Sequence, residues 1–196
     1  GFGGIFAMYS YIAPTVTEVT GLPASAVPIF LLVYGVSGLI GNIVAGRMGD
    51  WSVIRSIVIG LAGIGVALGV FAAVASYAVA ALVVLALISV LASVLVINLQ
   101  LRLMQVAGSA QTLAAASNHA ALNLANALGA WLGGLVIAAG FGYRAPSVVG
   151  VGLAALGLVI LGISLLIHRR DHPGRVSIRP GGPSGRDASS SVAQVS

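Results

Sequence analysis

The sequence contains no cysteine and no lysine, and only four of its 196 residues are acidic. The absence of cysteine excludes disulfides and thiolate metal sites. Only 7% of the residues are charged, whereas a soluble domain has about 25%. Meanwhile 59% are apolar, and the mean hydropathy is +1.09. Because a chain with so few charges needs lipid as its main solvent, the sequence predicts an integral membrane protein.

The soluble-enzyme motifs are also missing, since there is no GxSxG, P-loop, HExxH or carboxylate pair. The acids are scattered through the chain, at Glu18, Asp50, Asp171 and Asp187. The three histidines, His119, His168 and His172, do not stand at metal-ligand spacing. We therefore expect no enzyme, no metal site and no cofactor.

Six stretches are apolar enough to cross a bilayer, which takes about 20 residues. We expect an all-α bundle over 1–168, with spans at about 1–19, 27–45, 57–75, 77–99, 112–139 and 147–167. The segment 169–196, rich in Pro, Gly, Ser and Arg, is predicted to be a disordered basic tail. No charged region precedes the first apolar stretch, so we expect a fragment that begins inside or just before a span rather than a signal peptide.

Arginines indicate the orientation of these spans. Arg47, Arg55, Arg102 and five tail arginines fall on one side, and only Arg144 falls on the other. By the positive-inside rule the arginine-rich side is cytoplasmic. This predicts a multi-pass membrane protein with both termini in the cytoplasm. We expect its membrane to be a bacterial inner membrane. The net charge of +5 comes mainly from the tail, so it indicates topology and no nucleic-acid partner.

A polar stripe occupies the fifth predicted span. His119, Asn123 and Asn126 fall within about 60° of one another on a helical wheel. They could line a water-filled cavity that holds a substrate near the midplane, or they could bond to neighbouring helices as packing contacts. His119 could carry a coupled proton or stay neutral and hydrogen-bonded.

Two further groups of candidates stand elsewhere. Tyr9 and Tyr11, shortly before a proline that would kink the first span, are weaker candidates for the cavity. Small residues let helices approach closely in lipid, so Gly129 and Gly133 (a GxxxG pair) and Gly41 are predicted packing positions.

The predicted loop after the second span holds Gly46, Arg47, Asp50 and Arg55. Asp50 could accept from free N–H groups of the next helix and pair with arginine, latching two helices at the cytoplasmic surface. Alternatively, the loop carries ordinary positive-inside charge with one neutralising acid.

This loop resembles the signature of the major facilitator superfamily, roughly G-x-x-x-D-R-x-G-R-R. The match rests on Gly46, Asp50 and Arg55, while Trp51 and Val53 depart from the pattern. The stretches "YIAPTVTEVTGLPASAVPIFLLVYGVSGLIGNIVAGRMGD" and "NHAALNLANALGAWLGGLVIAAGFGY" are similar to the C-terminal half of the drug-proton and sugar-efflux branch, which includes arabinose-efflux and chloramphenicol-resistance exporters.

The resemblance implies a six-helix C-terminal half of a secondary transporter. Such a protein would export a drug or sugar-like small molecule by alternating access, driven by proton antiport. Its partners would be the lipid bilayer, the small-molecule substrate and a missing N-terminal six-helix half or a second copy. The alternative is a non-transporting six-helix scaffold or an inactive half-transporter remnant.

Overall fold

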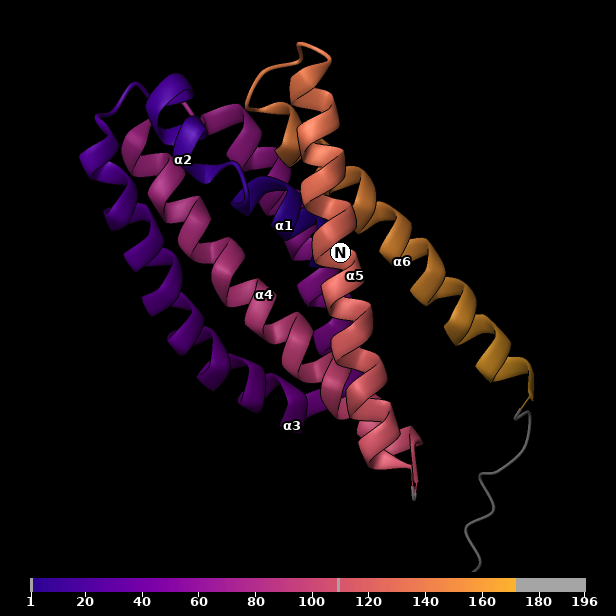
Figure 1. Ribbon diagram of the computed structural model, residues 1–196. Coiled ribbons are helices and arrows are strands. Elements are labelled where there is room, and N and C mark those ends of the chain that lie inside the picture. The colour runs from indigo at the N-terminus through magenta and orange to yellow at the C-terminus, as the bar shows by residue number, and fades with distance from the viewer. Residues whose placement is uncertain (1, 109, 172–196) are drawn as a thin grey trace, which may run out of the picture.

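The computed structural model describes residues 2–108 and 110–171, and this part of the chain is helical without any strand (Figure 1). The elements follow in the order α1 (Phe2–Tyr9), α2 (Ile12–Pro14), the π-helix η1 (Thr15–Val19), the 3-10 helix η2 (Ala24–Ala26), α3 (Val27–Val74), α4 (Ala78–Val106), α5 (Gln111–Ala138) and α6 (Ala145–Asp171).

The first predicted span is a broken helix. The α-helical path ends at Tyr9 and resumes at Ile12, and Tyr11 has φ −115° and ψ 21°. Proline clashes with the carbonyl four residues before it, and for Pro14 that residue is Ser10. The predicted kink therefore becomes an interruption, followed by a π-helical turn.

The 48-residue α3 consists of two arms joined at Ser52, whose φ of −172° and ψ of 111° are not helical. We call 27–51 the first arm and 53–74 the second arm. Both arms lie against the same turn of α4: a Cβ on Gly41 would stand 2.8 Å from Cβ of Ser93, and one on Gly60 would stand 3.3 Å from the nitrogen of Leu95. A straight helix would carry these two glycines about 28 Å apart. The chain therefore folds back at Ser52.

The predicted loop at 46–56 differs from the structure, because the first arm stays helical through Trp51. A helix satisfies its own backbone hydrogen bonds, so it can project beyond the apolar core without a loop. The backbone N–H of Arg55 donates to Oγ of Ser52 at 3.4 Å. This is the N-cap position of the second arm, and it allows the reversal within one residue.

Replacing Ser52 with alanine should lower the free energy of unfolding by about 1 kcal/mol, because an N-cap acceptor is lost. Ser52→Asp should retain the stability of the unmodified protein, since a carboxylate caps and also favours a helix N-terminus. Thermal unfolding in detergent measures both, with the exposed Ser25→Ala as control. Equal midpoints for Ser52→Ala and Ser25→Ala would show that Ser52 is not a cap.

The remaining helices are longer than predicted at some ends. The helix α4 continues to Val106 instead of ending near 99, and α6 continues through Asp171, beyond the predicted end at 167. The rest of the predicted tail, 172–196, lies outside the described residues. Four helices of the described part are long and apolar enough to cross a membrane, with α3 counted once.

The core lies between α1, both arms of α3 and α4, where Ile5, Phe30, Phe71, Leu85 and Ile88 are almost fully buried. The outer surface is also apolar: Leu32, Val66 and Val83 are each more than 60% exposed. Apolar patches this extensive are not tolerated in water. Helices apolar on both the inner and the outer face are those of a multi-pass membrane protein.

Candidate functional site: a cavity between α1, the first arm of α3 and α4

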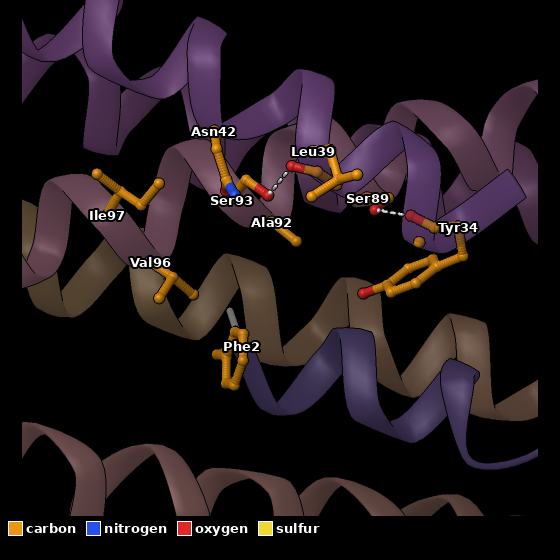
Figure 2. A pocket seen from close by; sticks show the side chains of 11 residues that line it. Phe2, Tyr34, Leu39, Asn42, Ser89, Ala92, Ser93, Val96 and Ile97 are labelled. Atoms are coloured by element: carbon orange, nitrogen blue, oxygen red, sulfur yellow. Dashed lines mark hydrogen bonds between the residues drawn. The ribbon is translucent and has the colours of Figure 1, made fainter. Parts of the chain in front are cut away.

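A cavity of about 370 Å³ opens where the first arm of α3 meets α4 and the start of α1 (Figure 2). Its polar side chains come from Tyr34 and Asn42 of the first arm and from Ser89 and Ser93 of α4. The remaining lining residues are Phe2, Gly35, Gly38, Leu39, Ala92, Val96 and Ile97. The cavity is therefore mostly apolar, with a few polar groups, which is the usual composition of a small-molecule site.

Serines fix the wall of this cavity by bonding from α4 to the first arm. The hydroxyl of Ser89 donates to the carbonyl oxygen of Tyr34 at 2.6 Å, and that of Ser93 donates to the carbonyl oxygen of Gly38 at 3.1 Å (Figure 2). Each hydroxyl oxygen keeps acceptor capacity for a ligand. These bonds hold α3 and α4 together as one unit.

Aromatic rings form a row along the cavity. Ring centroids are 5.3 Å apart for Phe2 and Phe6, 6.2 Å for Phe6 and Tyr9, and 4.7 Å for Tyr9 and Tyr34. Figure 2 shows the ring of Tyr34 reaching toward α1 on the same side as Phe2. Of these rings, Phe2 and Tyr34 line the cavity and offer flat apolar surface to a ligand, while no lining residue is charged.

The two tyrosines predicted as cavity residues, Tyr9 and Tyr11, have different surroundings in the structure. Tyr9 stacks on the cavity residue Tyr34, so it stands at the edge of the site. The hydroxyl of Tyr11 instead donates to the carbonyl oxygen of Ala130 at 2.9 Å, and its ring lies against Gly133. Tyr11, in the break between α1 and α2, thus connects this segment to α5 and does not line the cavity.

The polar stripe of α5 lies beside its packed face. His119 and Asn123 are exposed, and no hydrogen bond within the described residues involves either side chain. Asn126 is half-buried, and its Oδ1 is buried without a partner in that part of the chain. The residue that does bond to another helix is Asn118, whose amide donates to Oε1 of Gln100 on α4. The interhelical hydrogen bonds that packing contacts would require are thus not seen for His119 and Asn123.

The three predicted packing glycines are all buried at helix contacts. A Cβ on Gly129 would stand 2.0 Å from the carbonyl oxygen of Gly3, and one on Gly133 would stand 3.0 Å from that of Ala7. A Cβ on Gly41 would stand 2.8 Å from Cβ of Ser93 and 2.9 Å from Cα of Val90. These helices approach backbone to backbone, as small residues permit in a membrane.

The charged residues around the Ser52 turn are exposed. Arg55 lies over the ring of Trp51, 5.2 Å from its centroid, so the residue that departs from the family pattern holds the arginine by a cation–π contact. Asp50 makes no ion pair or hydrogen bond with the described residues. The N–H group of the next helix that was predicted to bond to Asp50 bonds to Ser52 instead. Gly46 and Arg47 are likewise exposed, with open space at the Cα of Gly46.

Sequence reasoning missed Tyr34 and Asn42 as cavity residues, and it attributed the polarity of Asn98 to a helix end. Asn98, which is 0% exposed, donates its amide to the carbonyl oxygens of Ala45 at 3.2 Å and Val94 at 2.9 Å. A signal existed in the spacing, because Tyr34, Gly38 and Asn42 stand four residues apart and share one helix face. That spacing does not predict the reversal of α3 at Ser52, which brings this face against α4.

Long apolar helices thus surround a cavity with few polar groups. The family model of the Major Facilitator Superfamily matches residues 1–193. The chain therefore belongs to this superfamily, as the sequence resemblance predicted.

Two curated relatives agree with this assignment. Inner membrane transport protein YdhP of Escherichia coli (strain K12) is 34% identical over 164 residues, which is 84% of this chain and 42% of YdhP. Uncharacterized MFS-type transporter YtbD of Bacillus subtilis (strain 168) is 35% identical over 176 residues, which is 87% of this chain and 44% of YtbD. The chain spans less than half the length of these relatives.

Proposed function

We propose that the chain forms one half of a secondary transporter, and that the cavity beside Tyr34 and Asn42 is its part of the substrate site. The observation that carries this proposal is a cavity lined by the exposed Asn42 and the half-buried Tyr34, with an interhelical wall fixed by serine hydroxyls. A preorganised, mostly apolar cavity suits a small uncharged or amphipathic molecule. Alternating access would move this half as a unit against a second six-helix half or a second copy.

The membrane topology that we propose has six crossings. The broken first helix supplies one, the two arms of α3 supply two, and α4, α5 and α6 supply the rest. At 48 residues α3 is about 72 Å long if straight, more than twice the apolar thickness of a bilayer. The arginine distribution supports cytoplasmic termini, and the name of YdhP supports an inner membrane.

Export of a drug or sugar-like molecule in exchange for protons is the form of transport we propose, on the branch resemblance of the sequence. The exposed His119 and Asn123, with the half-buried Asn126, form a separate polar stripe on α5, and we propose that the substrate also contacts this stripe. We propose that an acid in the other half carries the coupled proton, with His119 as the alternative carrier within this chain. The competing function, a scaffold or inactive remnant, predicts no transport.

An efflux assay tests the proposal. In cells that lack their main exporters, the protein produced together with its second six-helix half should lower the accumulation of at least one small molecule, and a protonophore should abolish this effect. Tyr34→Ala with Asn42→Leu should slow efflux about tenfold, because one stacking surface and one hydrogen-bonding group are lost.

The matched control is Val66→Ala with Val79→Ala, two exposed apolar positions outside the cavity. The control should transport at the rate of the unmodified protein. Unchanged efflux by the cavity variant at equal expression would contradict the site assignment, and no efflux of any compound by the unmodified protein would favour the scaffold.

A further inference from the structure

A second groove lies at the turn between α5 and α6. This turn is at the top of Figure 1. It has a volume of about 400 Å³ and shares no lining residue with the central cavity. Its walls are apolar except for one arginine, and the lining residues are Val136, Phe141, Arg144, Ala145, Val148 and Val149. Neither the proposed transport cycle nor the packing of the bundle assigns it a role.

The backbone fixes one wall of this groove. At the end of α5 the N–H of Phe141 donates to the carbonyl oxygen of Val136 at 3.1 Å, and that of Gly140 donates to Ile137 at 2.9 Å. With Gly140 at φ 86°, this is a Schellman motif, in which the residue after the glycine packs on the helix three positions before its cap. Phe141 is therefore held beside Val136, yet 74% of it is exposed. A large apolar side chain fixed in this way favours an apolar molecule that covers it.

Arg144 places a positive charge at the rim. Within the described residues its partner is the hydroxyl of Ser76, and no carboxylate pairs with it. A guanidinium carries five N–H donors, so most of them remain available. Arginine is well suited to phosphate, which it can bind through two parallel hydrogen bonds.

The neighbouring residues place this rim at the level of the lipid headgroups. Ser76 and the 70% exposed Tyr77 form the turn between α3 and α4, beside Arg144. Exposed tyrosines concentrate at the membrane–water interface. The groove thus extends from an interfacial cation down into the apolar layer along Val148, which is 59% exposed.

We propose that this groove binds one anionic phospholipid, with its phosphate on Arg144 and an acyl chain between Phe141, Val136 and Val148. A phospholipid matches both parts of the site, since it joins an anionic group to an aliphatic chain. The inference depends on the membrane location of the chain and not on transport.

Native mass spectrometry of the detergent-purified protein tests the lipid site, with dioleoylphosphatidylglycerol as the probe. The unmodified protein should retain one tightly bound lipid. Arg144→Gln should reduce its occupancy about tenfold, because charge-assisted hydrogen bonds are lost. Val148→Trp should reduce it to a similar extent by filling the groove, and Arg144→Lys should retain an intermediate occupancy because it keeps the charge but not the planar fork.

Two control variants separate the site from general effects. Arg55→Gln removes an exposed arginine beside an exposed aromatic ring at the opposite end of the helices, and Val66→Trp adds a ring to an apolar surface outside the groove. Both should bind the lipid within twofold of the unmodified protein, as a local site predicts. Equal loss in Arg55→Gln and Arg144→Gln would overturn the proposal. Displacement of the lipid by inorganic phosphate alone would also overturn it, because it would make the apolar groove irrelevant.

Discussion

Gly129→Ala should lower the free energy of unfolding by about 3 kcal/mol or more, beyond the usual overpacking cost. The added Cβ would stand 2.0 Å from the carbonyl oxygen of Gly3 and 2.9 Å from its carbonyl carbon. Both atoms belong to the backbone of α1, so no side chain can rotate away. The only relief is separation of α5 from α1, which should appear as a lower melting midpoint and aggregation in size-exclusion chromatography.

The matched control is Gly152→Ala on α6, where nothing lies within 4 Å of an added Cβ. Alanine is a better helix former than glycine by up to about 1 kcal/mol. Gly152→Ala should therefore be neutral or stabilising, although the chemical change is the same. A Gly129→Ala protein as stable as Gly152→Ala would contradict the close contact of α1 with α5.

Asn98→Asp should destabilise the protein by about 3 kcal/mol or more, because it buries an unpaired charge. The side chain is 0% exposed, its amide faces the carbonyl oxygens of Ala45 and Val94, and its Oδ1 is buried without a partner. An aspartate has the same shape but turns the donor into a second acceptor. Two carbonyl oxygens would then face a carboxylate, and the contact between α3 and α4 should open.

Two other substitutions isolate this effect in thermal unfolding. Asn98→Leu should change stability by no more than about 1 kcal/mol, because removal of the unpaired oxygen offsets the lost hydrogen bonds. Asn42→Asp places the same charge at an exposed position of the cavity and should be tolerated. Equal thermal unfolding midpoints for Asn98→Asp and Asn42→Asp would show that Asn98 is not buried as described.

The helices were largely predictable because each contains a long apolar run bounded by Gly, Pro or charge. The break at Ser10 follows from Pro14 by local sterics. A connection between the spans 27–45 and 57–75 was predicted, but the residue at which the helix reverses, Ser52, was harder to predict. The stretch "GRMGDWSVIR" has polar residues but no proline that would end a helix. The position of the reversal depends on a single cap and on the packing of both arms against α4, and neither is visible in local sequence.

The candidate site was predictable only in part, for the same reason. A helical wheel gathers His119, Asn123 and Asn126, but it does not say which neighbour faces them. Asn98 lies near a predicted helix end, where polarity needs no partner, yet the fold-back of α3 buries it completely. Tyr34 and Asn42 become cavity residues only once their arm lies beside α4 and α1. Burial and pairing are properties of the packed bundle.

The cavity can be tested directly by thiol accessibility, since the chain contains no cysteine of its own. A membrane-impermeant maleimide needs water and a thiolate, and neither is available in hydrocarbon. In membrane vesicles of both orientations, Asn42→Cys should label from at least one side. Leu32→Cys, on the same arm and 66% exposed outside the cavity, should label from neither side, although both should label after denaturation. If Asn42→Cys, like Leu32→Cys, labels from neither side, the result would contradict a water-filled substrate site between α1, the first arm of α3 and α4.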